Sequence, residues 1–155
     1  MDDENEVNVL DELNKGACMG MDAIHFVLEK AKDDNLRTEL NRQYERYKKI
    51  SEKICELYPE YSDRKPHKTN VMNKVMTWNS INMKTLTDDS TSKIAEHLVQ
   101  GTNMGIIEGR KLLNHKEIDP NVTRIAKEYV TMQEEAIEKL KNFYSFFLLK
   151  IIKIN

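Results

Sequence analysis

Hydrophobic positions recur at alternating spacings of three and four along most of the chain, which is the period of an amphipathic helix. We predict a first helix from Val7 to about Lys32 and a second that follows Asp33-Asp34-Asn35 and ends at Leu57. Because the connection is so short, the two helices must be antiparallel neighbours. The predicted buried stripes are Leu10, Leu13, Ala17, Gly20, Ile24, Val27 and Ala31 in the first helix, and Leu36, Leu40, Gln43, Tyr47, Ile50, Ile54 and Leu57 in the second.

The same pattern returns after a polar, proline-containing linker. A short helix is predicted from Asn70 to about Leu86, and Thr87-Asp88-Asp89-Ser90 ends it and caps the third long helix. Asp119-Pro120 opens a fourth long helix with proline in its first turn. The stripes are Ile94, Leu98, Gly101, Gly105, Glu108 and Leu112 in the third long helix, and Ile125, Tyr129, Met132, Ala136, Leu140, Phe143 and Phe147 in the fourth. Signals for β-strands are nearly absent, so we predict an all-α bundle in one domain. Its parts are hairpin one (7–57), linker and short helix (58–88) and hairpin two (90–149).

A short sequence motif occurs twice. Gly16-Ala17-Cys18-Met19-Gly20-Met21 returns 85 positions later as Gly101-Thr102-Asn103-Met104-Gly105-Ile106, and Glu52-Lys53-Ile54 returns 86 positions later as Glu138-Lys139-Leu140. The match predicts that the protein consists of two copies of a helical hairpin. Glycine inside a helix costs about 1 kcal/mol relative to alanine, so both glycine pairs require compensation. We therefore predict that Gly16, Gly20, Gly101 and Gly105 serve close helix packing.

Composition narrows the range of partners. The 155 residues contain 24 lysines and arginines against 26 aspartates and glutamates, a balance that argues against nucleic acid as a partner. The acidic, polar N-terminus is unlike a secretory signal, which favours a cytoplasmic location. Cys18 and Cys55 lack the spacing of a metal or redox pair and are expected to be reduced packing residues.

The apolar run at the end of the chain, 143–154, is interrupted by Lys150 and Lys153. It is too short for the roughly 20 apolar residues of a transmembrane helix, so no membrane span is expected. Two interpretations are open. The run packs on its own bundle or on a second copy of the chain, or it contacts a membrane surface.

Leu13-Asn14-Lys15-Gly16 opens one half of the repeat and Leu98-Val99-Gln100-Gly101 opens the other. With two hairpins joined by a long crossover, the chain resembles a ferritin-like four-helix bundle over roughly residues 7 to 143. It is most similar to small bacterial ferritin-like proteins of the spore coat protein F type. The resemblance implies a protein of a spore-forming bacterium, with an assembly role and an association with the spore.

The resemblance also implies where metal ligands would lie. Ferritin-like di-iron proteins carry a glutamate on each of two helices and a Glu-x-x-His pair on each of the other two. No Glu-x-x-His occurs in this chain, and the corresponding positions hold Ala17 or Cys18, Thr102 or Asn103, Gln43 and Arg46, and Tyr129 and Met132. The core polar residues Gln43, Tyr47, Thr102 and Tyr129 are thus expected to replace iron ligands, and we expect neither metal nor cofactor.

Three residues remain as weak metal candidates. Asp22 and His25 lie one helical turn apart, but two ligands do not make a site, and a solvated helix face is the favoured explanation for both residues. Glu108 falls in the predicted core stripe, where it is either buried and paired with the first helix or a boundary residue that reaches solvent. Through these residues the chain could alternatively be a metal-binding ferritin-like protein, either a di-iron oxidoreductase or a storage protein.

Motifs for nucleophilic catalysis or phosphate binding are absent from the sequence. Trp78 is expected to cover an open side of the bundle, although a role in ligand stacking is the alternative. We therefore predict a non-enzymatic protein with a structural or protein-interaction role, assembled as a homodimer through the aromatic tail or the face bearing Trp78. A small apolar ligand held between the hairpins, next to Gln43 and Tyr47, is a third possibility.

Overall fold

The computed structural model describes residues 3–66, 88–114 and 117–144, and these residues form helices without any strand. The elements are α1 (Glu4–Leu28), α2 (Asp34–Leu57), the short 3-10 helix η1 (Tyr58–Glu60), α4 (Thr91–Leu113) and α5 (Pro120–Lys141). The all-α prediction is therefore confirmed. The predicted short helix at 70–86, Trp78 and the tail beyond residue 144 lie outside the described residues.

Local signals place the helix starts. The Asp33 carboxylate accepts a hydrogen bond from the Leu36 amide at 2.8 Å and caps α2. Ser90 caps α4 in the same way, and Asp119 caps α5 with Pro120 in the first turn. The predicted starts of these three helices are confirmed. The first helix is displaced from its prediction, because it starts at Glu4 rather than Val7 and ends at Leu28 rather than near Lys32.

The loop between α1 and α2 is closed by a side chain. The Arg37 guanidinium donates hydrogen bonds to the backbone carbonyls of Leu28 and Ala31, the latter at 3.0 Å. The carbonyls at the end of a helix have no partner within the helix, so α2 supplies partners for the end of α1. These hydrogen bonds therefore stabilise the turn of the first hairpin.

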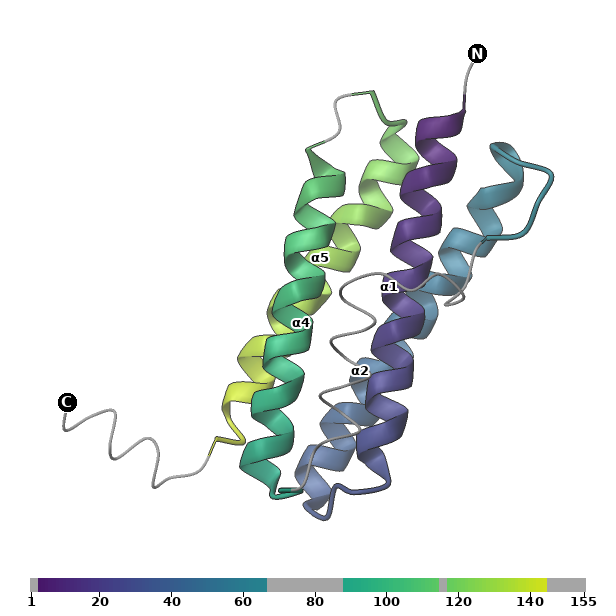
Figure 1. The fold of residues 1–155 in the computed structure, drawn as a ribbon. Coiled ribbons are helices and arrows are strands. Elements are labelled where there is room, and N and C mark those ends of the chain that lie inside the picture. Colours follow the sequence, from purple (N-terminus) through teal and green to yellow (C-terminus); the bar gives the residue numbers. More distant parts are fainter. Residues whose placement is uncertain (1–2, 67–87, 115–116, 145–155) are drawn as a thin grey trace.

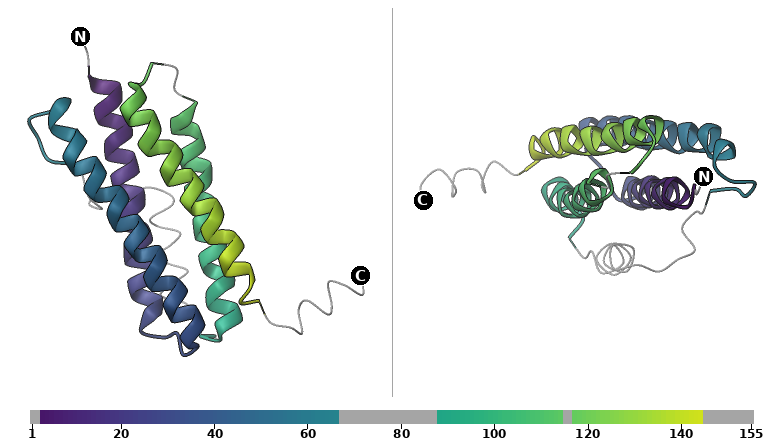
Figure 2. Two further views of the ribbon diagram at one scale, coloured as in Figure 1. Left: turned by 180° about the vertical axis from the view of Figure 1, so that it is seen from behind. Right: turned by 90° about the horizontal axis from the view of Figure 1, so that it is seen from above.

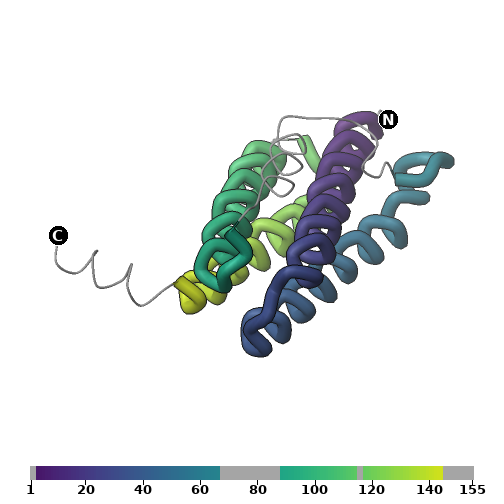
Figure 3. The backbone as a smooth tube through the Cα atoms, turned by 60° about the horizontal axis from the view of Figure 1, so that its bottom comes forward, coloured from purple at the N-terminus to yellow at the C-terminus, as the bar shows by residue number. Residues whose placement is uncertain are grey.

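The four long helices form two layers, α1 with α4 and α2 with α5 (Figures 1 and 2). Figure 3 shows that α2 and α4 run in the same direction, opposite to α1 and α5. The end of α2 and the start of α4 therefore lie at opposite ends of the bundle. Each hairpin contributes one helix to each layer.

The core runs along the bundle between the layers. The fully buried apolar side chains include Leu10, Leu13, Leu36, Leu40, Ile50, Ile54, Ile94, Val122, Met132 and Leu140. The predicted stripes of the first, second and fourth long helices are mostly buried. In α4 the buried line is rotated relative to the prediction and passes through Leu98, Thr102, Gly105 and Gly109. Glu108 lies off this buried line and is exposed. The spacing of three and four alone does not distinguish a line through positions 102 and 109 from one through positions 101 and 108.

Polar contacts join the helices around this core. Within the first hairpin, the Ser51 hydroxyl donates a 2.7 Å hydrogen bond to the buried Asn14 side chain. Between the hairpins, Arg46 pairs with Glu135 at 2.7 Å on the half-exposed surface of α2 and α5. Such surface pairs contribute little, typically below about 1 kcal/mol, so burial of apolar side chains is the main stabilising term. Across the described ranges, no helix is both long and apolar enough to cross a bilayer.

Candidate functional site

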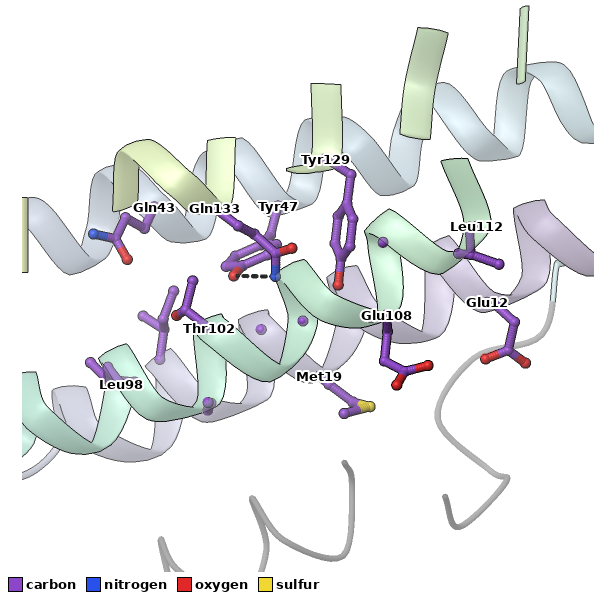
Figure 4. A pocket seen from close by; sticks show the side chains of 17 residues that line it. Glu12, Met19, Gln43, Tyr47, Leu98, Thr102, Glu108, Leu112, Tyr129 and Gln133 are labelled. Carbon is purple, nitrogen blue, oxygen red and sulfur yellow. Dashed lines mark hydrogen bonds between the residues drawn. The ribbon is translucent and has the colours of Figure 1, made fainter. Parts of the chain in front are cut away.

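A cavity of about 320 Å³ lies at the centre of the bundle, and residues from all four long helices line it (Figure 4). Glycines form much of the wall on α1 and α4, while larger polar side chains come from α2 and α5. The lining residues are Glu12, Gly16, Met19, Gly20, Ala23, Ile24, Gln43, Tyr47, Leu98, Gly101, Thr102, Gly105, Glu108, Gly109, Leu112, Tyr129 and Gln133.

In the first hairpin, glycines make room for two tyrosines. A Cβ atom at Gly20 would lie 2.6 Å from the ring of Tyr47, and one at Gly16 would collide with the Tyr129 hydroxyl. The two rings lie 6.4 Å apart between centroids, tilted by 59°. Gly16 and Gly20 therefore each receive a side chain from the other layer of the bundle.

The second hairpin contains corresponding contacts. A Cβ atom at Gly105 would collide with the Gln133 amide, and one at Gly109 would lie 2.6 Å from Val130. Gly105 follows Gly20 by 85 positions and Gln133 follows Tyr47 by 86, the two shifts of the sequence repeat. The contact between positions 20 and 47 therefore recurs between positions 105 and 133 with a different side chain.

A buried hydrogen bond joins the two hairpins at this point. The Gln133 Nε2 group donates to the Tyr47 hydroxyl oxygen at 3.3 Å. Gln133 is only 2% exposed, yet its Oε1 atom has no hydrogen-bond partner among the described residues. A buried acceptor without a partner costs about 1–3 kcal/mol. The cavity thus contains a polar atom that still lacks a donor.

Both tyrosines at the cavity are neutral. Burial raises the pKa of Tyr47, an effect that its hydrogen bonds to Gln133 and Thr102 only partly offset. Burial also raises the pKa of Tyr129, and the neighbouring Tyr47 raises it further. Neither phenol therefore ionises near neutral pH, and each acts as a hydrogen-bonding group rather than as an acid or base.

Charged groups lie at the rim. Glu12 and Glu108, with side chains 48% and 52% exposed, pair with Lys15 at 3.0 Å and Lys111 at 3.1 Å. Figure 4 shows both glutamates turned away from the Tyr47–Gln133 pair. The structure therefore places Glu108 at a boundary position that reaches solvent, one of the two alternatives left open by the sequence.

One carboxylate of α2, Glu39, is bonded to the lining residue Gln43. Glu39 accepts hydrogen bonds from Gln43 Nε2 at 3.0 Å and from Arg42 at 2.9 Å. Burial raises the pKa of Glu39, but the hydrogen bonds from Arg42 and Gln43 outweigh burial and hold the pKa below its usual value. Glu39 is therefore an ionised, paired carboxylate.

The weak metal candidates are not gathered into one site. Asp22 and His25 are exposed on α1, and burial raises the pKa of Asp22 although His25 opposes the shift. Across residues 3–66, 88–114 and 117–144, no group of three or more histidine, cysteine, aspartate or glutamate side chains is positioned to hold a metal ion. Asp22, His25 and Glu108 thus form no metal site in the structure.

The positions that the resemblance predicts to correspond to di-iron ligands do not fit such a centre. Gln43, Tyr129, Thr102 and Met132 are buried and uncharged, while Arg46 points outward to its ion pair with Glu135. Of the four core polar residues singled out in the sequence, all are buried and all line the cavity. Iron ligation in ferritin-like di-iron proteins requires several inward carboxylates, which these positions lack.

Two other sequence expectations concern the cysteines. Cys18 is half-buried, but Cys55 is exposed on α2, so the prediction that both pack inside is wrong for Cys55. The stripe of α2 passes through Ile54, which leaves the following residue on the outer face. Neither cysteine forms a disulfide with another of the described residues.

Sequence analysis missed Gln133 and Gly109. Gln133 corresponds to Tyr47 at a shift of 86, and this signal could have identified it. Gly109 has no glycine partner at position 24, where the chain has isoleucine, so the repeat gives no signal for it.

Comparisons with protein-family models, curated proteins and solved structures found no match for this chain. Its class therefore follows from the described fold and cavity. It is an all-α bundle of two antiparallel hairpins, with a neutral, hydrogen-bonded centre.

Proposed function

We propose that the chain is a ferritin-like bundle of two duplicated hairpins, without a di-iron centre, and that its role is structural or in protein interaction rather than catalytic. Two observations support the duplication. The contact between Gly20 and Tyr47 recurs between Gly105 and Gln133. In addition, α2 and α4 run in the same direction, as they do when a single long crossover joins two hairpins (Figure 3).

The hydrogen bond between Tyr47 and Gln133 carries the proposal. At the centre of the bundle, where an iron site would need buried carboxylates, the side chains are neutral and one is bonded across the hairpins. An ancestor that stopped binding iron would replace its carboxylates, because buried acids are costly without a cation. Gln43, Thr102 and Tyr129 are residues of the expected kind.

Elemental analysis tests this proposal. The full chain is expressed in medium supplemented with iron and manganese and purified without chelators, and bound metal is measured by mass spectrometry. We expect far less than one metal ion per chain. More than about one tightly held iron or manganese per chain would contradict the proposal and favour the metal-binding alternative with unconventional ligands.

We further propose that the protein works as a homodimer or larger assembly associated with the spore. Ile107 is the one large apolar side chain exposed in the described part of the chain. We expect the aromatic residues of the segment 143–154 to form the dimer contact, because aromatic side chains are enriched at interfaces. Light scattering should give twice the mass of the chain, and Phe146→Ser/Phe147→Ser should reduce it to one chain, whereas the control Ile107→Ser should not. A strict monomer at high concentration would contradict assembly.

A further inference from the structure

The central cavity has the properties of a ligand site. Its volume of about 320 Å³ is at the lower end of the range for small-molecule pockets. Four of its lining side chains, Gln43, Tyr47, Tyr129 and Gln133, are polar and almost completely buried. A packed core would fill such a space with apolar atoms, so the combination of open volume and buried polar groups indicates recognition of a molecule.

The unpartnered Oε1 atom of Gln133 defines one contact of that molecule. Gln133 lines the cavity, and its Nε2 group is already engaged with the Tyr47 hydroxyl. Its Oε1 atom accepts no hydrogen bond from the described residues. A molecule in the cavity that presents an O–H or N–H group would satisfy this acceptor.

The charge of the lining determines the charge of the molecule. The two glutamates among the lining residues, Glu12 and Glu108, are at the rim and paired with lysines. The inner lining is uncharged, so an ion placed there would lose its hydration without gaining a counter-charge. The site therefore selects a neutral molecule.

The shape of the cavity favours a ring. The tilted rings of Tyr47 and Tyr129 lie on the side of α2 and α5. The Tyr129 hydroxyl lies directly over Gly16 and the Tyr47 ring over Gly20, so the two phenols bound the open volume and do not leave space between themselves and the glycines. Aromatic faces pack well against another ring in tilted or offset geometry.

We propose that this cavity binds a small, neutral, ring-containing molecule that donates a hydrogen bond to Gln133 Oε1. This activity goes beyond the proposed structural role and does not depend on it. The aromatic ring packs against Tyr47 and Tyr129, and the donor group reaches the Gln133 amide. Molecules of the same shape without a donor bind less tightly.

Three probes of one size test the proposal. Isothermal titration calorimetry of the full chain is carried out with 2-naphthol, 2-methoxynaphthalene and 2-naphthoate. We expect 2-naphthol to bind about ten-fold more tightly than 2-methoxynaphthalene, the effect of one buried hydrogen bond, and 2-naphthoate not to bind measurably. Equal affinity for all three probes, or no binding of any of them, would overturn the proposal.

Matched variants locate the contact. Gln133→Leu should lower the affinity for 2-naphthol to that for 2-methoxynaphthalene, whereas Gln100→Leu makes the same change at an exposed position of α4 and should alter neither. Unchanged preference in folded Gln133→Leu would refute the role of Gln133. Should that variant fail to fold, NMR of the wild-type chain replaces it. The Gln133 side-chain amide signal must then shift on addition of 2-naphthol, and a signal that stays in place refutes the site.

Discussion

Gly20 in the first hairpin and Gly105 in the second each lie beneath a side chain of the neighbouring helix, and the two side chains differ. At Gly20 the side chain is Tyr47, a rigid ring, and at Gly105 it is Gln133, whose amide is the end of a flexible chain. The two residues are bonded to each other across the hairpins. Equivalent positions therefore hold complementary rather than identical groups.

This difference shows how a repeated backbone can acquire an asymmetric centre. Two tyrosines or two glutamines at positions 47 and 133 would compete for the same space or leave it partly empty. One ring and one amide fill it and share a hydrogen bond, but they leave Gln133 Oε1 without a partner. The first hairpin thus supplies bulk at the centre, and the second supplies the unsatisfied polar atom.

Truncation of Tyr47 and of Gln133 to alanine should give the largest difference in stability between the two hairpins. Tyr47→Ala is expected to lower the free energy of unfolding by about 3–5 kcal/mol, because a buried aromatic ring is lost. Gln133→Ala should cost only about 1–2 kcal/mol, because it removes one hydrogen bond and an atom that lacked a partner. Urea denaturation followed by circular dichroism measures both. Equal losses would mean that the two hairpins contribute alike.

Alanine at the two glycines should give a smaller but clearer contrast. At Gly20 the new methyl group meets the Tyr47 ring, which cannot yield easily, so overpacking exceeds the gain of about 1 kcal/mol in helix propensity. We expect Gly20→Ala to destabilise by about 1–2 kcal/mol. At Gly105 the Gln133 amide can move aside, so Gly105→Ala should be within about 0.5 kcal/mol of wild type. Thermal unfolding monitored by calorimetry compares the stability of the two variants. A larger loss in Gly105→Ala than in Gly20→Ala would contradict the view that Gln133 yields more easily than Tyr47.

Exchange of the two side chains tests whether they form a unit. Tyr47→Gln and Gln133→Tyr should each lower the free energy of unfolding. The double variant should lose about 1 kcal/mol less than the sum of the two single losses, because a tyrosine–glutamine hydrogen bond is restored. Denaturant unfolding of the four proteins in this cycle gives the coupling energy. A coupling energy of zero would show that the hydrogen bond is incidental.

The smallest expected effect depends on pH. The pKa of Glu39 is held below its usual value in the folded state, so its pairing stabilises the protein above the unfolded pKa of about 4 and the contribution is lost as pH falls through the lower, folded value. Glu39→Gln should therefore flatten the fall in stability at acid pH, by well under 1 kcal/mol. Glu138→Gln, on the exposed end of α5, is the control. An identical fall in the free energy of unfolding at acid pH in wild type and Glu39→Gln would show that the pairing of Glu39 does not contribute to stability.

Much of the fold could be predicted from local patterns. Periodicity located the four long helices, and Asp33, Ser90 and Asp119 marked three of their starts, since capping depends only on neighbouring residues. The predicted stripe of α4 passed through Glu108 because two lines with the same spacing run along this helix, and the helices packed against it decide which line is buried. The exposure of Cys55, by contrast, follows from the predicted stripe of α2 itself, because the residue after Ile54 lies on the outer face of the helix.

The candidate site was only partly predictable. Gln43, Tyr47, Thr102 and Tyr129 stood out as polar residues at core positions or at positions equivalent to ligands, and all of them line the cavity. The cavity itself and the unpartnered Oε1 atom of Gln133 depend on which side chain lies opposite each glycine. That information belongs to the packing of two helices and is not contained in the periodicity of either.

The hydrogen bonds from Arg37 to the backbone carbonyls of Leu28, at the end of α1, and Ala31, in the following loop, bear on the order in which the protein folds. They link residues close in sequence, so the loop they close is short and the entropy lost on closing it is small. The first hairpin can therefore form early, and pairing with the second hairpin, between residues far apart in sequence, is the slower event. In hydrogen exchange during refolding, amides around this turn should be protected before those at the Tyr47–Gln133 contact.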